Sequence, residues 1–281
     1  MESKARQLEA LLKDMAGVLV AFSGGVDSSV LLAAAHEALG DKVVAATGTS
    51  ASFPALDLES ARTISSKLGV RWITLESGEL DDRRYKGNPA NRCYYCKKSL
   101  FLRLLKRASE EGLPFVIEGS NTDDLNDFRP GLEAVRELGI RSPFLEAGID
   151  KEMVRSLARH YGLPNWDKPS SPCLASRIPY GELITAERLQ RIDQSEGLLR
   201  GLGFRQLRVR DHGTLARIEL MPEDIGRLLE PSLREAAIAA CKEAGYTFVT
   251  LDLKGYRTGA MHEALMKVND DPAPRESGHR A

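Results

Sequence analysis

Long apolar runs, a basic surplus and abundant cysteine are all missing from this 281-residue sequence, which has four cysteines and a formal net charge of −1. No apolar run approaches the roughly 20 residues of a membrane-spanning helix, so we expect no membrane partner. Proteins that bind nucleic acids usually carry a clear basic surplus, so no nucleic-acid partner is expected. The charged N-terminus does not resemble a secretion signal, and we predict a cytoplasmic protein.

Two familiar phosphate-binding loops are also absent. The sequence contains neither G-x-x-x-x-G-K-[ST] nor G-x-G-x-x-G. In their place, residues 23–29 read Ser-Gly-Gly-Val-Asp-Ser-Ser, between an apolar run at 17–22 and a helical pattern at 30–36. Backbone N–H groups and the positive end of the helix dipole meet at such a helix start and favour an anion. Each residue alone fits a serine-capped helix after a glycine turn, but the whole string favours a phosphate site.

Short apolar runs alternate with helical patterns along the first half of the chain. Strands are predicted at 17–22, 42–47, 70–75 and 114–119, and a last strand of this domain is expected at 141–144. This rhythm is typical of an α/β fold, an open parallel sheet with helices on both faces. Ligands of such folds bind beyond the carboxyl ends of the strands. The polar residues 119–124 fall on that edge, as a turn that caps a helix or as carboxylates near Mg²⁺.

The second half of the chain is organised differently. The stretch 163–180 holds four prolines and no periodic pattern, which is typical of a functional loop or a linker. Alternating runs at 206–210 and 215–220 predict a hairpin with one solvent-facing side, turned at 211–213; helices near 223–229 and 232–244 and a strand at 248–253 follow. We therefore expect a first domain at 1–165, a loop at 166–184 that carries Cys173, a smaller α+β domain at 185–268, and a disordered tail at 269–281.

The four cysteines divide into a pair and two single residues. Cys93 and Cys96 form a C-x-x-C pair at a predicted helix start, where the dipole stabilises a thiolate. The pair suits a redox site, half of a zinc site or part of an iron–sulfur site, and the absence of a second pair makes structural zinc the weakest of these. Cys173 lies in the irregular loop, a setting that favours reactivity. Cys241 lies among small apolar residues and is predicted to be a buried structural thiol.

The string at 23–29 resembles the PP-loop of the ATP pyrophosphatases, which cleave ATP between the α and β phosphates. Four further strings make the resemblance specific: Gly-Ser-Asn-Thr-Asp-Asp at 119–124, Lys-Pro-Ser-Ser-Pro-Cys-Leu-Ala-Ser-Arg at 168–177, Ala-Arg-Ile-Glu at 216–219 and Asp-Leu-Lys-Gly-Tyr-Arg at 252–257. With these strings the chain resembles the LarE family from about Leu8 to Met261. LarE proteins are ATP-dependent sulfur transferases of nickel-pincer nucleotide synthesis.

The resemblance implies a fold, a reaction and an assembly. The fold is the adenine nucleotide alpha hydrolase-like sheet, and the assembly is a homo-oligomer, a hexamer in this family. In the reaction, ATP adenylates a carboxylate of pyridinium-3,5-biscarboxylic acid mononucleotide and releases pyrophosphate. A sulfur nucleophile then displaces AMP and leaves a thiocarboxylate. An adenylate is a far better acceptor than a carboxylate, and the loop dipoles neutralise the departing pyrophosphate.

The source of the sulfur has two interpretations. In one LarE type a cysteine at the position of Cys173 gives up its own sulfur and becomes dehydroalanine, and that type lacks the C-x-x-C pair. This sequence has the pair and is more similar to the three-cysteine type, in which Cys93, Cys96 and Cys173 hold a [4Fe–4S] cluster. Other classes remain open: a PP-loop tRNA thiolation enzyme, an ammonia-using synthetase of the GMP or NAD type, and a nucleotide-binding sensor.

The resemblance also implies a set of site residues. Expected contacts to ATP, Mg²⁺ and pyrophosphate are Ala21, Ser23, Gly24, Gly25, Asp27, Ser28, Ser29, Thr47 and Asp123. Expected contacts to the substrate are Lys97, Arg177, Arg208 and Arg210, with Glu219 as a cation ligand. Arg129 is placed to reach a phosphate. Without the resemblance, the charged residues of the second domain are read as solvated surface residues or weak ion pairs.

Overall fold

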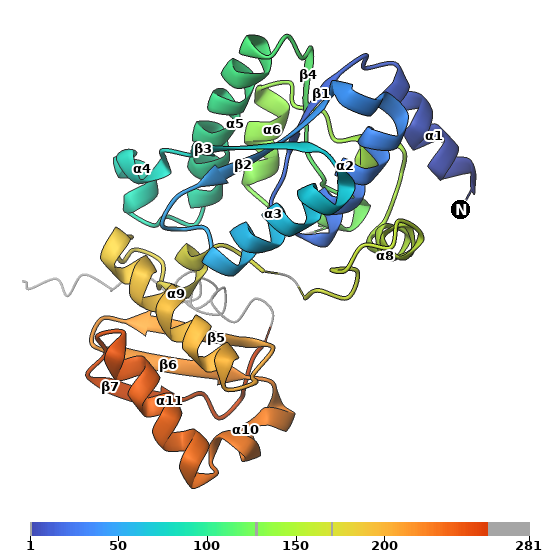
Figure 1. Ribbon diagram of the computed structural model, residues 1–281. Helices are drawn as coiled ribbons and strands as arrows, with labels where there is room; N and C mark the ends of the chain where they lie inside the picture. Colours follow the sequence, from blue (N-terminus) through green and yellow to red (C-terminus); the bar gives the residue numbers. More distant parts are fainter. Residues whose placement is uncertain (1, 127–128, 170, 258–281) are drawn as a thin grey trace, which may run out of the picture. The chain divides into compact units, whose positions relative to one another are not determined.

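Four parallel strands form the sheet of the first half of the chain (Figure 1). The structure is a computed structural model that describes residues 2–126, 129–169 and 171–257. The strands are β1 (Val18–Ala21), β2 (Val43–Thr49), β3 (Arg71–Glu76) and β4 (Phe115–Ile117), and their order is β3-β2-β1-β4. Val18 pairs with Val43 and with Phe115, so β1, β2 and β4 run in step and end at one edge.

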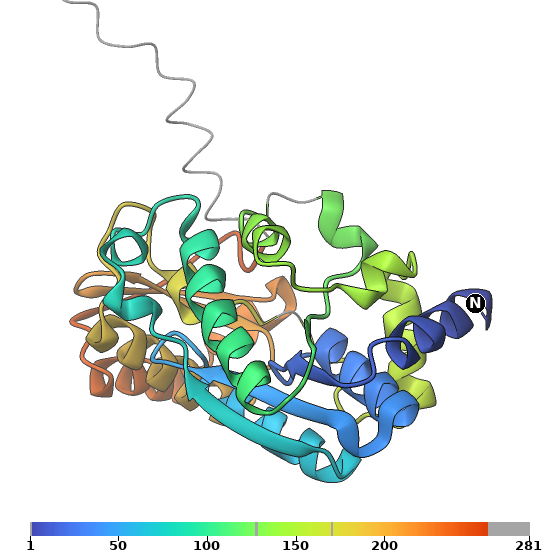
Figure 2. The ribbon, with the colours of Figure 1, turned by 90° about the horizontal axis from the view of Figure 1, so that it is seen from above.

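Helices cover both faces of this sheet, because residues in β1 alternate between two apolar cores. Val18 and Val20 pack with α1 (Glu2–Lys13), α2 (Val26–Leu39), α3 (Ala55–Leu68) and α8 (Lys151–His160). Leu19 packs on the other face with α5 (Arg92–Glu110) and α6 (Gly131–Glu137). Figure 2 shows the green α5 on one side of the blue and cyan strands. The predicted parallel sheet with helices on both faces is confirmed.

The expected last strand at 141–144 is wrong. Arg141 makes a single parallel bridge to Ile117, and Pro143 then begins the short helix α7 (Pro143–Glu146). Proline has no backbone N–H to donate to a ladder, and its fixed φ suits the first turn of a helix. Phe144 on this helix is fully buried, so its apolar side chain packs into the core from a helix and not from a strand. Short connecting helices complete this part: η1 (Gly40–Lys42), η2 (Glu79–Asp81), α4 (Arg83–Lys86) and η3 (Thr122–Asn126).

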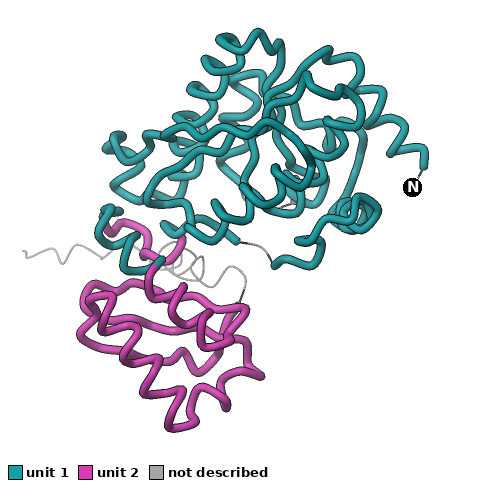
Figure 3. The backbone as a smooth tube through the Cα atoms, in the orientation of Figure 1, with its two compact units in different colours: residues 1–175, 183–193 teal, residues 176–182, 194–281 magenta. Residues whose placement is uncertain are grey.

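The chain divides into two compact units (Figure 3). Unit 1 comprises the chain up to Ala175 together with Leu183–Asp193, and unit 2 comprises Ser176–Glu182 and the chain from Gln194 onward. Elements that lie wholly or partly in unit 2 are η4 (Leu174–Arg177), α9 (Ala186–Gly201), β5 (Leu207–His212), β6 (Leu215–Leu220), α10 (Pro222–Leu228), α11 (Pro231–Glu243) and β7 (Phe248–Leu251). The expected disordered tail at 269–281 lies outside the described residues.

Unit 2 contains a three-stranded sheet in the order β5-β6-β7, with β5 antiparallel and β7 parallel to β6. The smaller α+β part of the predicted fold class is therefore confirmed. Strand β5 continues through Asp211 to His212, which the sequence had assigned to the turn. Cys241 is fully buried in this core, as expected, and burial raises the pKa of its thiol to about 11.

The predicted solvent-facing side of the hairpin is wrong, because its charged residues are buried in ion pairs. Arg208 and Arg210 are 3% and 5% exposed, and Glu219 is fully buried. Arg210 Nη2 lies 2.7 Å from Glu219 Oε2. The arginine and glutamate side chains thus face one another inside unit 2, where the alternating pattern predicted contact with water.

A second buried pair joins Arg177 to Glu196 on α9. Arg177 Nε and Nη2 donate to the two carboxylate oxygens at 2.8 and 2.9 Å, and both side chains are fully buried. The Val209 N–H also donates to Glu196, at 3.0 Å. Burial alone raises the pKa of Glu196, but the Arg177 guanidinium outweighs it and the pKa falls to about 2. Glu196 therefore stays charged at neutral pH and fixes Arg177.

Replacing Glu196→Gln is expected to destabilise unit 2 by about 3–5 kcal/mol, because the buried Arg177 guanidinium then loses the carboxylate charge that it binds at two points. Both tryptophans, Trp72 and Trp166, lie in unit 1, so fluorescence does not report on this change. Amide hydrogen exchange in β5 and β6 measures it directly. The exposed pair of Arg234 and Glu235 on α11 supplies the control. Glu235→Gln should leave exchange in β5 and β6 as in the wild type. Equal exchange in Glu196→Gln and Glu235→Gln would contradict a stabilising role for the buried Arg177–Glu196 pair.

The pH dependence of unit 2 follows from the lowered pKa of Glu196. A carboxylate whose folded pKa lies below its unfolded value stabilises the fold above the unfolded pKa, and loses that contribution as pH falls through the folded pKa. The contribution of Glu196 to stability is thus complete above pH 4.5, the ordinary glutamate pKa, and is lost as the pH falls toward about 2. In Glu196→Gln, hydrogen exchange in β5 should change less between these pH values than in the wild type. The same slope in both proteins would show that other carboxylates dominate acid unfolding.

Candidate active site

The loop between β1 and α2 has a backbone that only glycine adopts readily. Gly24 has a φ of +69°, and a Cβ there would lie 2.7 Å from the Ala61 backbone nitrogen. The serine hydroxyls bind within the loop: Ser23 Oγ lies 3.1 Å from Ser28 Oγ, and Ser29 Oγ donates to the Gly25 carbonyl at 2.7 Å. Gly25 caps α2 with no side-chain hydrogen bond. The first N–H groups of a helix have no partner within it, so this helix start suits an anion.

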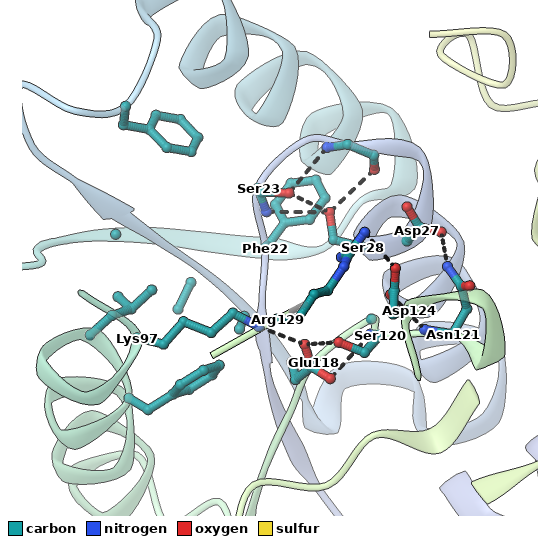
Figure 4. A pocket seen from close by; sticks show the side chains of 18 of the residues that line it. Phe22, Ser23, Asp27, Ser28, Lys97, Glu118, Ser120, Asn121, Asp124 and Arg129 are labelled. Atoms are coloured by element: carbon teal, nitrogen blue, oxygen red, sulfur yellow. Dashed lines mark hydrogen bonds and ion pairs between the residues drawn. The ribbon is translucent and has the colours of Figure 1, made fainter. Parts of the chain in front are cut away.

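A pocket of about 530 Å³ opens beside this loop (Figure 4). Polar walls come from the loop, from the residues after β4 and from Lys97 on α5. Apolar walls come from Ala46 on β2 and from Phe53, Leu100 and Phe101. The pocket therefore has a helix-terminus anion site at one side and an apolar surface at another, as a nucleotide requires. Its position at the carboxyl ends of β1, β2 and β4 agrees with the expectation for an open parallel sheet.

Acidic and basic side chains alternate around the pocket. Asp27 pairs with Lys151 on α8 and accepts a hydrogen bond from Asn121 Nδ2 at 3.1 Å. Asp124 pairs with Arg129 at 2.8 Å. Asp123 accepts from the Lys151 backbone N–H at 3.2 Å. Three cationic groups (Lys97 is the third) and four carboxylates (Glu118 is the fourth) thus surround a space that can take a triphosphate and Mg²⁺, whose preferred ligands are carboxylate and phosphate oxygens.

Lys97 is held in the pocket by Glu118, at the end of β4. Its Nζ lies 3.4 Å from Glu118 Oε2, and Glu118 also accepts from Ser142 Oγ at 2.6 Å. Burial raises the pKa of Glu118, but Lys97 and the serine hydroxyls lower it further than burial raises it. An ionised Glu118 therefore orients the Lys97 ammonium. Lys97 follows Cys96 directly in the sequence, so the pocket and the cysteine pair share one helix turn.

Most of the predicted nucleotide contacts line the pocket, and the others support it. The lining residues among them are Ala21, Ser23, Gly25, Asp27, Ser28 and Asp123, with Lys97 from the substrate set. Gly24, Ser29 and Thr47 lie behind this wall. Thr47 Oγ1, for example, donates to the Phe22 carbonyl at 2.6 Å and accepts from Trp72 Nε1 at 2.8 Å. Thr47 thereby ties β2 to the start of the loop.

Three residues of the site were missed by the sequence analysis: Glu118, which lines the pocket, and Lys151 and Asn165, which bind the loop. Glu118 carried a signal, because it falls at the end of a predicted strand. Lys151 and Asn165 carried none, since only the folded chain brings them to the loop from α8 and from the segment after it. Asn165 Nδ2 donates to the Gly24 carbonyl at 3.1 Å and to Ser29 Oγ at 3.0 Å.

The three cysteines Cys93, Cys96 and Cys173 come together in unit 1. Cys93 is an exposed residue at the start of α5, and Cys96 and Cys173 are partly buried. Burial raises the pKa of Cys96, and the charges of Glu79, Cys173 and Cys93 raise it further. Partial loss of solvent around the thiol raises the pKa of Cys93, and the charge of Cys173 raises it further, although Arg92 partly offsets both. Cys173 is thus close enough for its charge to act on both thiols of the pair.

These raised pKa values correct the expectation that the helix dipole stabilises a thiolate in the pair. A low pKa is typical of redox and nucleophilic cysteines, so the redox-pair interpretation is weakened. Within the described residues, no group of three or more His, Cys, Asp or Glu side chains is arranged to hold a metal ion. By ligand type, however, three neighbouring cysteine thiols are suitable for an iron–sulfur cluster, whose irons are bound by cysteine thiolates.

The other predicted substrate contacts form one buried cluster in unit 2. It contains Arg177, Arg208, Arg210 and Glu219, with Glu196. Burial and the Arg177 charge lower the pKa of Arg208 to about 10, and its guanidinium lies 5.1 Å from the centre of the Tyr256 ring. Glu219 has two arginine partners, since Arg217 Nη2 also lies 3.2 Å from it.

No helix within the described ranges is long and apolar enough to cross a membrane.

Comparison with known proteins places these features in a family, although no family model matches the chain. The chain is 42% identical to an uncharacterized protein of Synechocystis, over 95% of this chain and all of the relative. It is 39% identical to the pyridinium-3,5-bisthiocarboxylic acid mononucleotide synthase of Lactiplantibacillus plantarum, over 95% of this chain and 97% of the relative. A tRNA-specific 2-thiouridylase of Carboxydothermus hydrogenoformans is 28% identical, over 62% of this chain and 60% of the relative.

The synthase relative matches almost the whole chain, including both units, whereas the 2-thiouridylase matches less than two thirds of it. The nucleotide-sized pocket beside a PP-loop and the extent of this match lead to one assignment. The chain belongs to the LarE family of ATP-dependent sulfur transferases.

Proposed function

We propose that this enzyme adenylates the carboxylates of pyridinium-3,5-biscarboxylic acid mononucleotide and converts them to thiocarboxylates. The observation that carries the proposal is the junction of pocket and cysteines on one turn of α5, where Lys97 lines the pocket and Cys96 precedes it. The relative in L. plantarum is named as the synthase of the corresponding bisthiocarboxylic acid. We further propose a cytoplasmic homo-oligomer, a hexamer by family resemblance, with no nucleic-acid partner.

In the first step a substrate carboxylate oxygen attacks the α-phosphorus of ATP, and the bond to pyrophosphate breaks. The N–H groups at the start of α2 stabilise the charge that develops on the leaving pyrophosphate. Asp27 and Asp123 supply carboxylate oxygens for Mg²⁺. Lys97 and Arg129 supply positive charge for the phosphates or for the substrate carboxylate. The apolar side of the pocket, with Phe53 and Phe101, suits the adenine base.

In the second step sulfur attacks the acyl carbon, the bond to the adenylate oxygen breaks, and AMP leaves with the electron pair. Cys93, Cys96 and Cys173 would hold a [4Fe–4S] cluster, which when bound supplies an iron with a free coordination position for an extra sulfide. Three neighbouring thiols support this proposal, because donation of sulfur from Cys173 alone gives Cys93 and Cys96 no role. Lys97 and Arg92, which lower the pKa of Cys93, would stabilise the bound thiolate.

Removal of a loop hydroxyl tests the first step. Ser28→Ala removes the contact to Ser23 and is expected to lower kcat/KM for pyrophosphate release by about 10²-fold, because a preorganised anion site is lost. Ser65→Ala, which removes only a bond to the Arg62 carbonyl within α3, serves as the control. Pyrophosphate release should require the pyridinium mononucleotide. Release that tRNA triggers, and the mononucleotide does not, would instead support the tRNA thiolation alternative.

Iron content and polypeptide mass, measured on one anaerobically reconstituted sample, test the second step. Wild-type protein is expected to bind about four iron atoms per chain with visible absorption, as a cubane cluster does. Cys93→Ser, Cys96→Ser and Cys173→Ser should each abolish this binding. Cys241→Ala, which changes the buried thiol of unit 2, should not. If turnover removes one sulfur and two hydrogens from the chain, and only Cys173→Ser is inactive, sacrificial donation by Cys173 is correct and the cluster proposal is wrong.

A further inference from the structure

The carbonyl oxygen of Gly24 accepts hydrogen bonds from two other parts of unit 1. Ser60 Oγ on α3 lies 3.3 Å from it, Asn165 Nδ2 lies 3.1 Å away, and Lys168 Nζ lies 3.4 Å away. Asn165 is buried, and its Nδ2 also donates to Ser29 Oγ at 3.0 Å, so one amide binds the loop and the first turn of α2 together. Asn165 and Lys168 precede Cys173 by only eight and five residues.

Asp57 on α3 binds the same segment a second time. Its carboxylate lies 2.9 Å from Lys168 Nζ and accepts from Ser171 Oγ at 2.7 Å. Asp57 is 7% exposed, so water screens these bonds little. Lys168 therefore bridges Gly24 of the PP-loop to Asp57, and Asp57 in turn binds the chain two residues before Cys173.

The other side of Cys173 is fixed by the connection between β2 and α3. The Leu174 N–H donates to the Ser52 carbonyl at 2.9 Å. Ser52 Oγ donates to Glu79 at 2.6 Å, and the same carboxylate accepts from Ser50 and Ser77. Glu79 is 1% exposed, which makes this network a rigid support. Cys173 thus lies between two anchored positions, and the anchor before it includes the PP-loop itself.

We propose that Lys168 and Asn165 are positioning residues that couple occupancy of the PP-loop to the position of Cys173. The inference rests on the proposed function, because it concerns the order of its two steps. A phosphate ligand binds the N–H groups of the loop, while Asn165 and Lys168 bind a carbonyl of the same loop. A phosphate that fixes the loop through its N–H groups therefore also fixes the Gly24 carbonyl, and this favours one position of the segment 165–173 that binds the carbonyl. Cys173 is then in place when the adenylate forms.

The acyl-adenylate has two fates, and positioning decides between them. Attack by sulfide breaks the acyl C–O bond, releases AMP and gives the thiocarboxylate. Attack by water breaks the same bond, releases AMP and returns the original carboxylate. One pyrophosphate has already left in both cases. The number of thiocarboxylates formed per pyrophosphate released therefore measures the coupling, whatever the absolute rate.

The test compares this ratio in four reconstituted full-length variants, with ATP, the pyridinium dicarboxylate mononucleotide and sodium sulfide at fixed concentrations. In Lys168→Met and Asn165→Ala the ratio is expected to fall about tenfold, within the usual range for coupling between sites. Lys168→Arg keeps the charge and should recover most of the ratio. The control is Lys67→Met, since Lys67 donates to the Gly162 carbonyl at 2.7 Å and, within the described residues, bonds neither Gly24 nor Asp57. It should keep the wild-type ratio.

A wild-type ratio in Lys168→Met and Asn165→Ala would overturn the inference, even if both partial rates fell, because a purely structural role slows the two steps together. If wild-type protein itself releases no pyrophosphate with the mononucleotide, the proposed function fails instead. A second measurement then still tests the coupling: alkylation of Cys173 by iodoacetamide in iron-free protein. Inorganic pyrophosphate should slow it about fivefold in the wild type and leave it unchanged in Lys168→Met. Equal protection in both proteins would contradict the coupling.

Discussion

The left-handed backbone at Gly24 is the constraint on which the site depends. Its φ of +69° and the 2.7 Å approach that a Cβ would make to Ala61 allow the loop to pack directly against α3. This close approach has two consequences. The start of α2 is left open to an anion at the pocket, and the Gly24 carbonyl faces side chains of α3 and of the segment before Cys173. One turn thereby connects the phosphate site with the sulfur-bearing loop.

Charge is handled differently in the two units. In the pocket of unit 1, Lys97, Arg129 and Lys151 are partly exposed and each pairs with a carboxylate, so phosphate oxygens can compete for them. In unit 2, Arg177 and Glu196 are fully buried with two-point hydrogen bonding. A buried pair of this kind seldom adds net stability over apolar side chains, but its disruption is costly. Such a cluster is therefore better explained by specificity of structure or binding than by stability.

The parallel sheet, its helices and the glycine turn at the start of α2 could be predicted from the sequence, because each depends on local patterns. The string at 23–29 and the alternation of apolar runs are contiguous signals, and strands of one direction must end at one edge. The sequence correctly predicted a hairpin at 207–220, but the prediction that one of its sides faces solvent was wrong. An alternation of arginine with valine predicts that the arginines face solvent. The prediction changes only when Glu196 and Glu219 are known to be buried partners for arginines of unit 2.

The same limit explains the missed residues. Asn165 and Lys151 contact the loop from more than a hundred residues away, and no spacing rule relates them to it. The strand expected at 141–144 failed for a local reason: Pro143 has no N–H for the ladder and begins a helix there. Contiguous chemistry was thus predictable, and long-range pairing was not.

The placement of Cys173 in an irregular segment is consistent with the precision that sulfur transfer requires. An unanchored loop would lose conformational entropy each time its cysteine reached the adenylate. Here part of that loss is met on folding, because Lys168 and Ser171 bind Asp57 before Cys173 and Leu174 binds Ser52 after it. Reacting groups held in place before the reaction gain rate through proximity. The irregular backbone brings Cys173 near Cys93 and Cys96, and the same segment binds the PP-loop through Asn165. A regular helix or strand over these residues would not make both contacts.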